Sequence, residues 1–309
     1  MYQKFFRHFI AISLIVWTIF ALLFYQHLNL LAIVFIAFML GLRHGFDVDH
    51  IVAIDNVTRQ LAASGKPSVT TGLFFALGHS SIVFLLTLLV ILGVSLTKAE
   101  DLGIIGIGAM IGSIVSIVFL WLTGGMNLIS LYRLVKYQQN KHAHSPLTRW
   151  FKPLFTLVDK PYKMYPVGFL FGLGFDTATE IALLGLAATA SLSGESIWLI
   201  LSLPIAFALG MTWVDSLDAL LMTRLISSQN VNDQLFRRYN IAILLIVITA
   251  SFAVGLIQLL GLIERDIEGV VSFIGDHSPW FGAGLVLIML VVFVSMILKK
   301  RVLMNRQKI

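Results

Sequence analysis

The chain has 309 residues, of which 58% are hydrophobic and only 12% are charged, with a formal net charge of +6 and no cysteine. A soluble domain carries about 25% charged residues, so this composition excludes an ordinary soluble protein. The lack of cysteine excludes disulfides and metal sites that use thiolates. We predict an all-α, polytopic membrane protein formed by one integral membrane domain over residues 1–309.

Apolar stretches of about 20 residues, long enough to cross a bilayer as a helix, recur along the whole chain. We predict eight transmembrane helices at roughly 9–25, 29–55, 69–93, 104–130, 166–190, 196–223, 240–262 and 280–298. The first stretch follows Lys4 and Arg7 but has no small-residue cleavage site, so we interpret it as a retained anchor. A basic connector at 136–165 separates a first half (1–135) from a second half (166–309).

The basic residues predict the orientation of the chain. Most of the 22 Lys and Arg residues fall in the tails and in the loops on one side, whereas the opposite loops are mainly acidic. Because positively charged loops stay in the cytoplasm, we predict a multi-pass protein of the cell inner (cytoplasmic) membrane with both termini cytoplasmic. Contact of these loops with anionic membrane lipid accounts for the net charge, and no nucleic-acid partner is expected.

Ionisable residues occur in the apolar cores of only four predicted spans, the second, third, fifth and sixth. Each such residue costs about 2.5–3.5 kcal/mol on insertion scales, so it usually has a functional role. Histidine and carboxylate are ligands that divalent transition metals accept. We predict a metal site of His44, Asp47, His50 and His79, with Asp176, Glu180, Asp215 and Asp218 as further ligands or partners of ligands. The histidines are the expected direct ligands.

Spacing along the second span separates its polar residues into two groups. His44, Asp47 and His50 follow one another at intervals of three, so a regular helix would spread them over one broad face. Asp49 points away from that face unless the helix is broken. Asp55 precedes Arg59 by four residues, which favours an ion pair at the helix end. For any single buried residue, a structural hydrogen bond is the alternative interpretation.

A short repeat relates the two halves of the chain. Gly45-Phe46-Asp47 recurs as Gly174-Phe175-Asp176, and Leu77-Gly78 recurs as Leu209-Gly210. Units three spans apart have opposite orientations, so we predict an inverted repeat of spans 2–4 and 5–7, an arrangement that often encloses a substrate site. The glycines beside the aspartates fit locally unwound helices. Close helix packing is the alternative, and it is compatible with a homo-oligomer.

Four motifs, in order, resemble those of the nickel/cobalt transporter (NiCoT) permeases. The run Arg43-His44-Gly45-Phe46-Asp47-Val48-Asp49-His50-Ile51 resembles the second-helix signature of that family, H-x4-D-H. The counterparts of its third-, fifth- and sixth-helix motifs are residues 77–83, 173–181 and 210–218. This chain has Gly45 and Val48 where alanine is usual, and Ser216 where threonine is usual.

The resemblance implies high-affinity, low-capacity uptake of Ni²⁺, Co²⁺ or both by a secondary transporter that needs no ATPase subunit. It also makes His44, Asp49 and His50 central to metal recognition. The metal is then the transported substrate, and we expect no cofactor and no enzymatic activity.

Two alternatives from the sequence concern direction and class. An exporter of a related family is one, although the connector offers only His142 and His144 as loop histidines. A membrane metalloenzyme is disfavoured because H-E-x-x-H is absent, and an ATP-driven pump because no Walker-type motif occurs. The sequence leaves open the choice of metal. It also leaves open whether protons, which compete for histidine, or the membrane potential drives uptake.

Overall fold

The computed structural model describes residues 2–92, 104–137, 158–174, 178–227, 234–263 and 268–306. Every regular element within these ranges is helical, in agreement with the all-α prediction. The helices are α1 (Tyr2–Leu23), α2 (Leu28–His44), α3 (Val48–Ala63), α4 (Thr71–Ile91), α6 (Ile104–Tyr137), the 3-10 turn η1 (Pro161–Lys163), α9 (Met164–Gly172), α10 (Ala178–Leu192), α11 (Ile197–Ser227), α12 (Gln234–Ile263) and α13 (Glu268–Arg306).

Several of these helices are long and apolar enough to cross a membrane. Five qualify alone, namely Gln3–Leu23, Thr71–Ile91, Gly106–Lys136, Ile197–Ile226 and Asn240–Ile263. α2 and α3 qualify together as a sixth, bent by 60° at the break between them. Two shorter apolar stretches lie in α10 and α13. These lengths and compositions are those of a multi-pass membrane protein.

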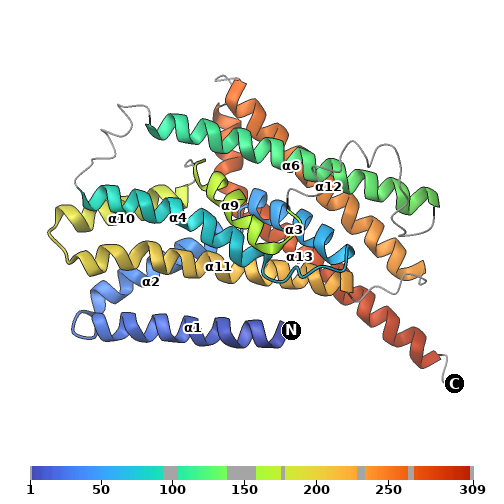
Figure 1. Cartoon of the computed structure of the whole chain (residues 1–309), viewed down its shortest axis with the longest axis horizontal. Helices are drawn as coiled ribbons and strands as arrows, with labels where there is room; N and C mark the ends of the chain where they lie inside the picture. The colour runs from blue at the N-terminus through green and yellow to red at the C-terminus, as the bar shows by residue number, and fades with distance from the viewer. Residues whose placement is uncertain are drawn as a thin grey trace.

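Figure 1 shows most helices running roughly along one direction, with α1 along one side and the pair α6 and α12 along the other. Between them, α11 packs on α2, α3 and α4, while α3 also contacts α6, α12 and α13. The start of α1 and the end of α13 lie toward the right of the view, and the connections α1–α2 and α10–α11 lie at the left. α3 therefore lies in the interior of the bundle.

Apolar residues fill the interior and also cover the outside. One core cluster surrounds α3 and includes Ile51 and Phe75, and another lies between α2 and α11 and includes Phe207. Ile12 and Leu14 on α1 are more than half exposed. An apolar exterior of this kind suits contact with lipid, because the bilayer core offers no polar partners.

Two glycines allow α2 and α11 to approach to backbone contact. A Cβ added to Gly41 would lie 2.0 Å from the carbonyl oxygen of Phe207, and one added to Gly210 would lie 2.2 Å from that of Phe38. Residue numbers rise along one helix as they fall along the other, so the pair is antiparallel. Any side chain at either glycine would separate the two helices.

α4 and α9 are joined by a second contact of the same form. A Cβ added to Gly78 would lie 2.0 Å from the carbonyl oxygen of Tyr165, and one added to Gly168 would lie 2.1 Å from that of Phe75. The spacing of glycine and aromatic residue on each helix is the same as in the α2–α11 pair. Each half of the chain thus contributes one helix to each pair.

We expect Gly41→Ala and Gly168→Ala each to lower the stability of the folded protein by about 1–3 kcal/mol, because the added methyl group must push a backbone away. Thermal unfolding of the purified protein in detergent measures this effect. Gly125→Ala and Gly185→Ala are matched controls, since nothing lies within 4 Å of the added Cβ. Unchanged unfolding temperatures for the first two variants would contradict the packing described.

Candidate metal centre

A break in the second predicted span brings two histidines face to face. α2 ends at His44, and α3 begins at Val48, so His50 lies in the first turn of the new helix. The backbone between them closes in two turns, with the Phe46 N–H donating to the Arg43 carbonyl and the Asp47 N–H to that of His44. Asp47 is extended (φ −60°, ψ 135°), and aspartate favours this position before a helix. The helix is therefore interrupted just after Gly45, although Gly45 itself keeps helical backbone angles.

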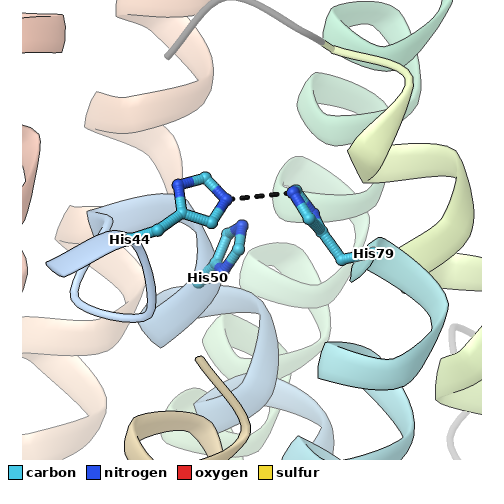
Figure 2. Close-up of side chains that lie close together, drawn as sticks. All are labelled: His44, His50 and His79. Atoms are coloured by element: carbon cyan, nitrogen blue, oxygen red, sulfur yellow. Dashed lines mark hydrogen bonds between the residues drawn. The ribbon is translucent and has the colours of Figure 1, made fainter. Parts of the chain in front are cut away.

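His44, His50 and His79 form a compact triangle of imidazoles. Figure 2 shows the first two projecting from either side of the break and His79 projecting toward them from α4. Their ring centroids are 4.7–4.8 Å apart, and one ligand nitrogen from each lies within 4.8 Å of the others. All three side chains are buried. Nitrogen atoms gathered in this way can share one cation.

The closest nitrogen pair has the spacing of two ligands on one ion. Nε2 of His44 lies 2.9 Å from Nε2 of His79. Two nitrogens that are each about 2.1 Å from a metal, at a right angle, are about 3 Å apart. Phe207 and Phe75 lie beside His44 and His50, with ring centroids 5.4 and 4.9 Å away. These rings keep the local dielectric low, which strengthens electrostatic attraction to a cation.

Carboxylates contact two of the imidazoles. Oδ2 of Asp47 lies 2.8 Å from Nδ1 of His44, and the Thr179 hydroxyl lies 3.1 Å from the same nitrogen. A carboxylate partner at Nδ1 favours the tautomer whose Nε2 lone pair is available to a metal. Glu180 lies 2.8 Å from Nε2 of His79 and 3.8 Å from Nε2 of His44. The second half of the chain thus reaches the centre through α10.

Asp49 contacts the start of α3 and a side chain of α12. Its Oδ1 accepts a hydrogen bond from the His50 N–H at 3.0 Å, and its Oδ2 lies 3.5 Å from the Gln258 amide nitrogen of α12. A carboxylate in the first turn of a helix is stabilised by the free N–H groups there. In these contacts Asp49 supports the start of α3.

Three further carboxylates lie along α3 and α11. Asp55, Asp215 and Asp218 are all buried, and none of their oxygens has a hydrogen-bond partner within the described part of the chain. Asp215 interacts electrostatically with His44, whereas Asp218 interacts with Asp55 and Asp215. The three therefore extend the polar interior from the imidazoles toward the C-terminal ends of both helices.

The ion pair expected between Asp55 and Arg59 is not formed in this structure. The Arg59 guanidinium donates instead to Oδ1 of Asn240 at 3.0 Å and to the sulfur of Met222 at 3.4 Å. No ion pair within 4.0 Å joins Arg59 to Asp55 in the described ranges. Partners on α12 and α11 therefore replace the contact that four-residue spacing favours.

Asp176 lies outside the described residues. The remaining residues of the sequence-based site fall into three groups. His44, His50, His79, Asp47 and Glu180 come together, Asp49 supports the adjoining helix turn, and Asp215 with Asp218 continues the polar interior along α11. Thr179 and Gln258 were not predicted. Thr179 could have been found from its place beside Glu180 in the repeated motif, whereas Gln258 had no signal of its own.

The fold and this centre define a multi-pass helical protein with a buried histidine cluster suited to a transition-metal cation. The chain matches the family described as high-affinity nickel-transport protein over residues 30–300, and it belongs to that family. The predicted resemblance to nickel/cobalt transporters is therefore confirmed.

Three relatives are similar to this chain over most of its length. The chain is 41% identical to the nickel transporter NixA of Staphylococcus aureus over 260 residues, which cover 78% of this chain and 76% of the relative. It is 38% identical to the high-affinity nickel-transport protein NixA of Helicobacter pylori over 256 residues, 75% of each chain. It is also 38% identical to the cobalt transport protein NhlF of Rhodococcus rhodochrous over 264 residues, 80% of this chain and 70% of that one. No solved structure matches the chain.

We expect Glu180→Gln to weaken Ni²⁺ binding by about 10–100-fold, because it removes a negative charge beside the two Nε2 atoms that face each other in the centre. Isothermal titration of the purified protein with Ni²⁺ measures the affinity. Glu195→Gln, an exposed position just after α10, is the control that removes a carboxylate elsewhere. Equal affinities in the two variants would show that Glu180 has no part in the centre.

Proposed function

We propose that this protein is a secondary transporter that imports Ni²⁺, Co²⁺ or both across the cytoplasmic membrane through an intramembrane His/Asp site. The observation that carries the proposal is the convergence of His44, His50 and His79, three buried imidazoles from three helices, within ligand distance of one another. Relatives named for nickel and for cobalt transport support this metal class.

The proposed architecture has eight spans in two inverted halves. α9 and α10 together form a broken span like α2 and α3, and α13 is the eighth. Two observations support the repeat. α9 ends at Gly172 and α10 begins at Ala178, on either side of the second Gly-Phe-Asp motif, as α2 and α3 flank the first. The two glycine contacts, α2 on α11 and α9 on α4, also exchange under the same symmetry.

In this proposal both termini are cytoplasmic, because the basic loops face that side. The start of α1 and the end of α13 lie toward the same side of the molecule in Figure 1, which fits such an orientation. The acidic residues Asp215 and Asp218 then lie on the cytoplasmic side of the imidazoles, since α11 runs toward its basic end at Arg224.

The histidines are the proposed direct ligands. Asp47 holds the ring of His44 through Nδ1, whereas Glu180 faces the Nε2 atoms of His79 and His44 and is a further carboxylate ligand in this proposal. Ni²⁺ takes about four to six ligands, so the nine residues of the site do not all bind at once. Asp49, Asp176, Asp215 and Asp218 complete the set as ligands reached during passage or as charges that offset the dication in a low dielectric. Neutral imidazole and carboxylate replace part of the water shell of the ion.

A cation released from the imidazoles meets Asp215 and then the pair Asp218 and Asp55 on its way inward. Carboxylates buried without hydrogen bonds are costly, and a passing cation relieves that cost. The membrane potential contributes about 2.3 kcal/mol per charge per 100 mV, or about 4.6 kcal/mol for a dication. In this proposal the membrane potential drives the dication inward, so no ATPase subunit is needed.

We expect His44→Ala and His50→Ala to abolish Ni²⁺ accumulation, because each removes one of three converging imidazoles. Uptake of radiolabelled Ni²⁺ and Co²⁺ into cells, and into liposomes with an imposed inside-negative potential, measures it. His27→Ala is the control, since that side chain is exposed between α1 and α2. Membrane insertion of each variant is verified by the amount of purified protein.

Two outcomes would overturn the proposed function. Retained uptake in either histidine variant would show that the three histidines are not the transport site. Loss of preloaded metal from cells that express the wild-type chain would show that the protein exports metal. Uptake of both metals that is lost in the two variants and kept in His27→Ala is the expected pattern.

A further inference from the structure

At the helix break of the metal centre, the first backbone N–H groups of α3 do not bond to the side chain of the preceding Asp47. Asp47 occupies the position before α3 whose side chain normally accepts a hydrogen bond from the new helix. Its carboxylate makes no such bond and lies 2.8 Å from Nδ1 of His44 instead. α3 therefore begins without the cap that its own sequence offers.

A residue of α13 serves a different donor at the same helix start. The Val48 N–H, the first of α3, donates to the hydroxyl oxygen of Ser278 on α13 at 3.1 Å. The donor that an Asp47 cap would serve, the His50 N–H, donates instead to Oδ1 of Asp49. The Val48 N–H has no partner within its own helix, so the Ser278 hydroxyl ties the residue that follows Asp47 to α13.

The same face of α13 approaches the break most closely one turn further on. A Cβ added to Gly282 would lie 1.8 Å from the carbonyl oxygen of Phe46, in the middle of the break. Residues four apart lie on one face of a helix, so Ser278 and Gly282 together form one surface against residues 46–48. α13 passes beside α3 in Figure 1, and the two helices are in contact.

We infer that Ser278, with Gly282, is a positioning element of the metal centre. It holds residues 46–48 of the break against α13 and thereby keeps the Asp47 carboxylate oriented toward His44. Ser278 does not bind the metal. The inference rests on the proposed function, because it concerns the affinity of the proposed Ni²⁺ site. It predicts that loss of the Ser278 hydroxyl lets the start of α3 shift and moves the Asp47 carboxylate away from His44.

The first experiment compares Ni²⁺ affinities of the full-length purified protein by isothermal titration. We expect Ser278→Ala to bind Ni²⁺ about 10–100-fold more weakly, the range seen when partners of ligands are lost. Ser278→Thr keeps the hydroxyl and is expected to bind within about threefold of wild type. At saturating Co²⁺, the visible absorption bands of Ser278→Ala should shift, whereas those of Ser278→Thr should not.

A second perturbation tests the same surface without touching Ser278. Gly282→Ala should weaken Ni²⁺ binding at least about tenfold, since the methyl group would displace the break. Gly284→Ala is its matched control on the same helix, because nothing lies within 4 Å of the added Cβ. Unfolding temperatures of all variants separate a local change from loss of the fold.

A double-mutant comparison distinguishes positioning from a general structural contribution. If Ser278 acts through Asp47, then Ser278→Ala should have little further effect on affinity in an Asp47→Ala background. An equal loss in both backgrounds would overturn the inference, as would wild-type affinity in Ser278→Ala while His44→Ala loses binding. A wild-type chain that binds neither Ni²⁺ nor Co²⁺ would overturn the proposed function together with this inference.

Discussion

A helix interrupted inside an apolar bundle must find partners for the backbone groups that the interruption releases. The break between α2 and α3 meets this constraint with residues from distant parts of the chain, and the geometry of the centre follows from it. His44 is the last residue of α2, and His50 lies in the first turn of α3. The two rings can therefore face each other, with His79 of α4 beside them. A continuous helix would have placed them on a broad face, too far apart to share one ion.

Close packing between the halves has an equally simple cause. Glycines at the crossings of α2 with α11 and of α4 with α9 bring backbones into direct contact, and such contacts supply van der Waals attraction where lipid provides no hydrophobic driving force between helices. The centre lies next to both crossings, since Phe207 and Phe75 belong to them and also lie beside His44 and His50. Movement of one half of the chain against the other would therefore change the positions of the imidazoles.

The sequence predicted the members of the centre better than their roles. Ionisable residues in apolar spans are rare enough that His44, His50, His79 and Glu180 could be found without a structure. Glycine and aspartate near each other at 45 and 47 favoured a helix break there, with close packing as the alternative, and Gly45 also packs against Val214. Asp55 and Arg59 show the limit of local rules, since Asn240 on a distant helix competes for the guanidinium.

Residues that act across the bundle left no trace in the sequence. Gln258 lies in a predicted span without ionisable residues, and Ser278 lies just before the eighth predicted span. A serine in a helix can also bond to its own backbone, so neither residue predicts a distant partner. Only the three-dimensional path of α12 and α13 past the break gives these residues a partner.

The bond from Val48 to Ser278 joins residues 230 positions apart. Ribosomes add about 5–20 residues per second, so the first N–H of α3 waits about 10–50 s for its partner while the rest of the chain is synthesised. During that interval the start of α3 lacks the contact that holds residues 46–48 against α13. The full set of contacts around Asp47 and His44 can therefore form only after α13 has been made.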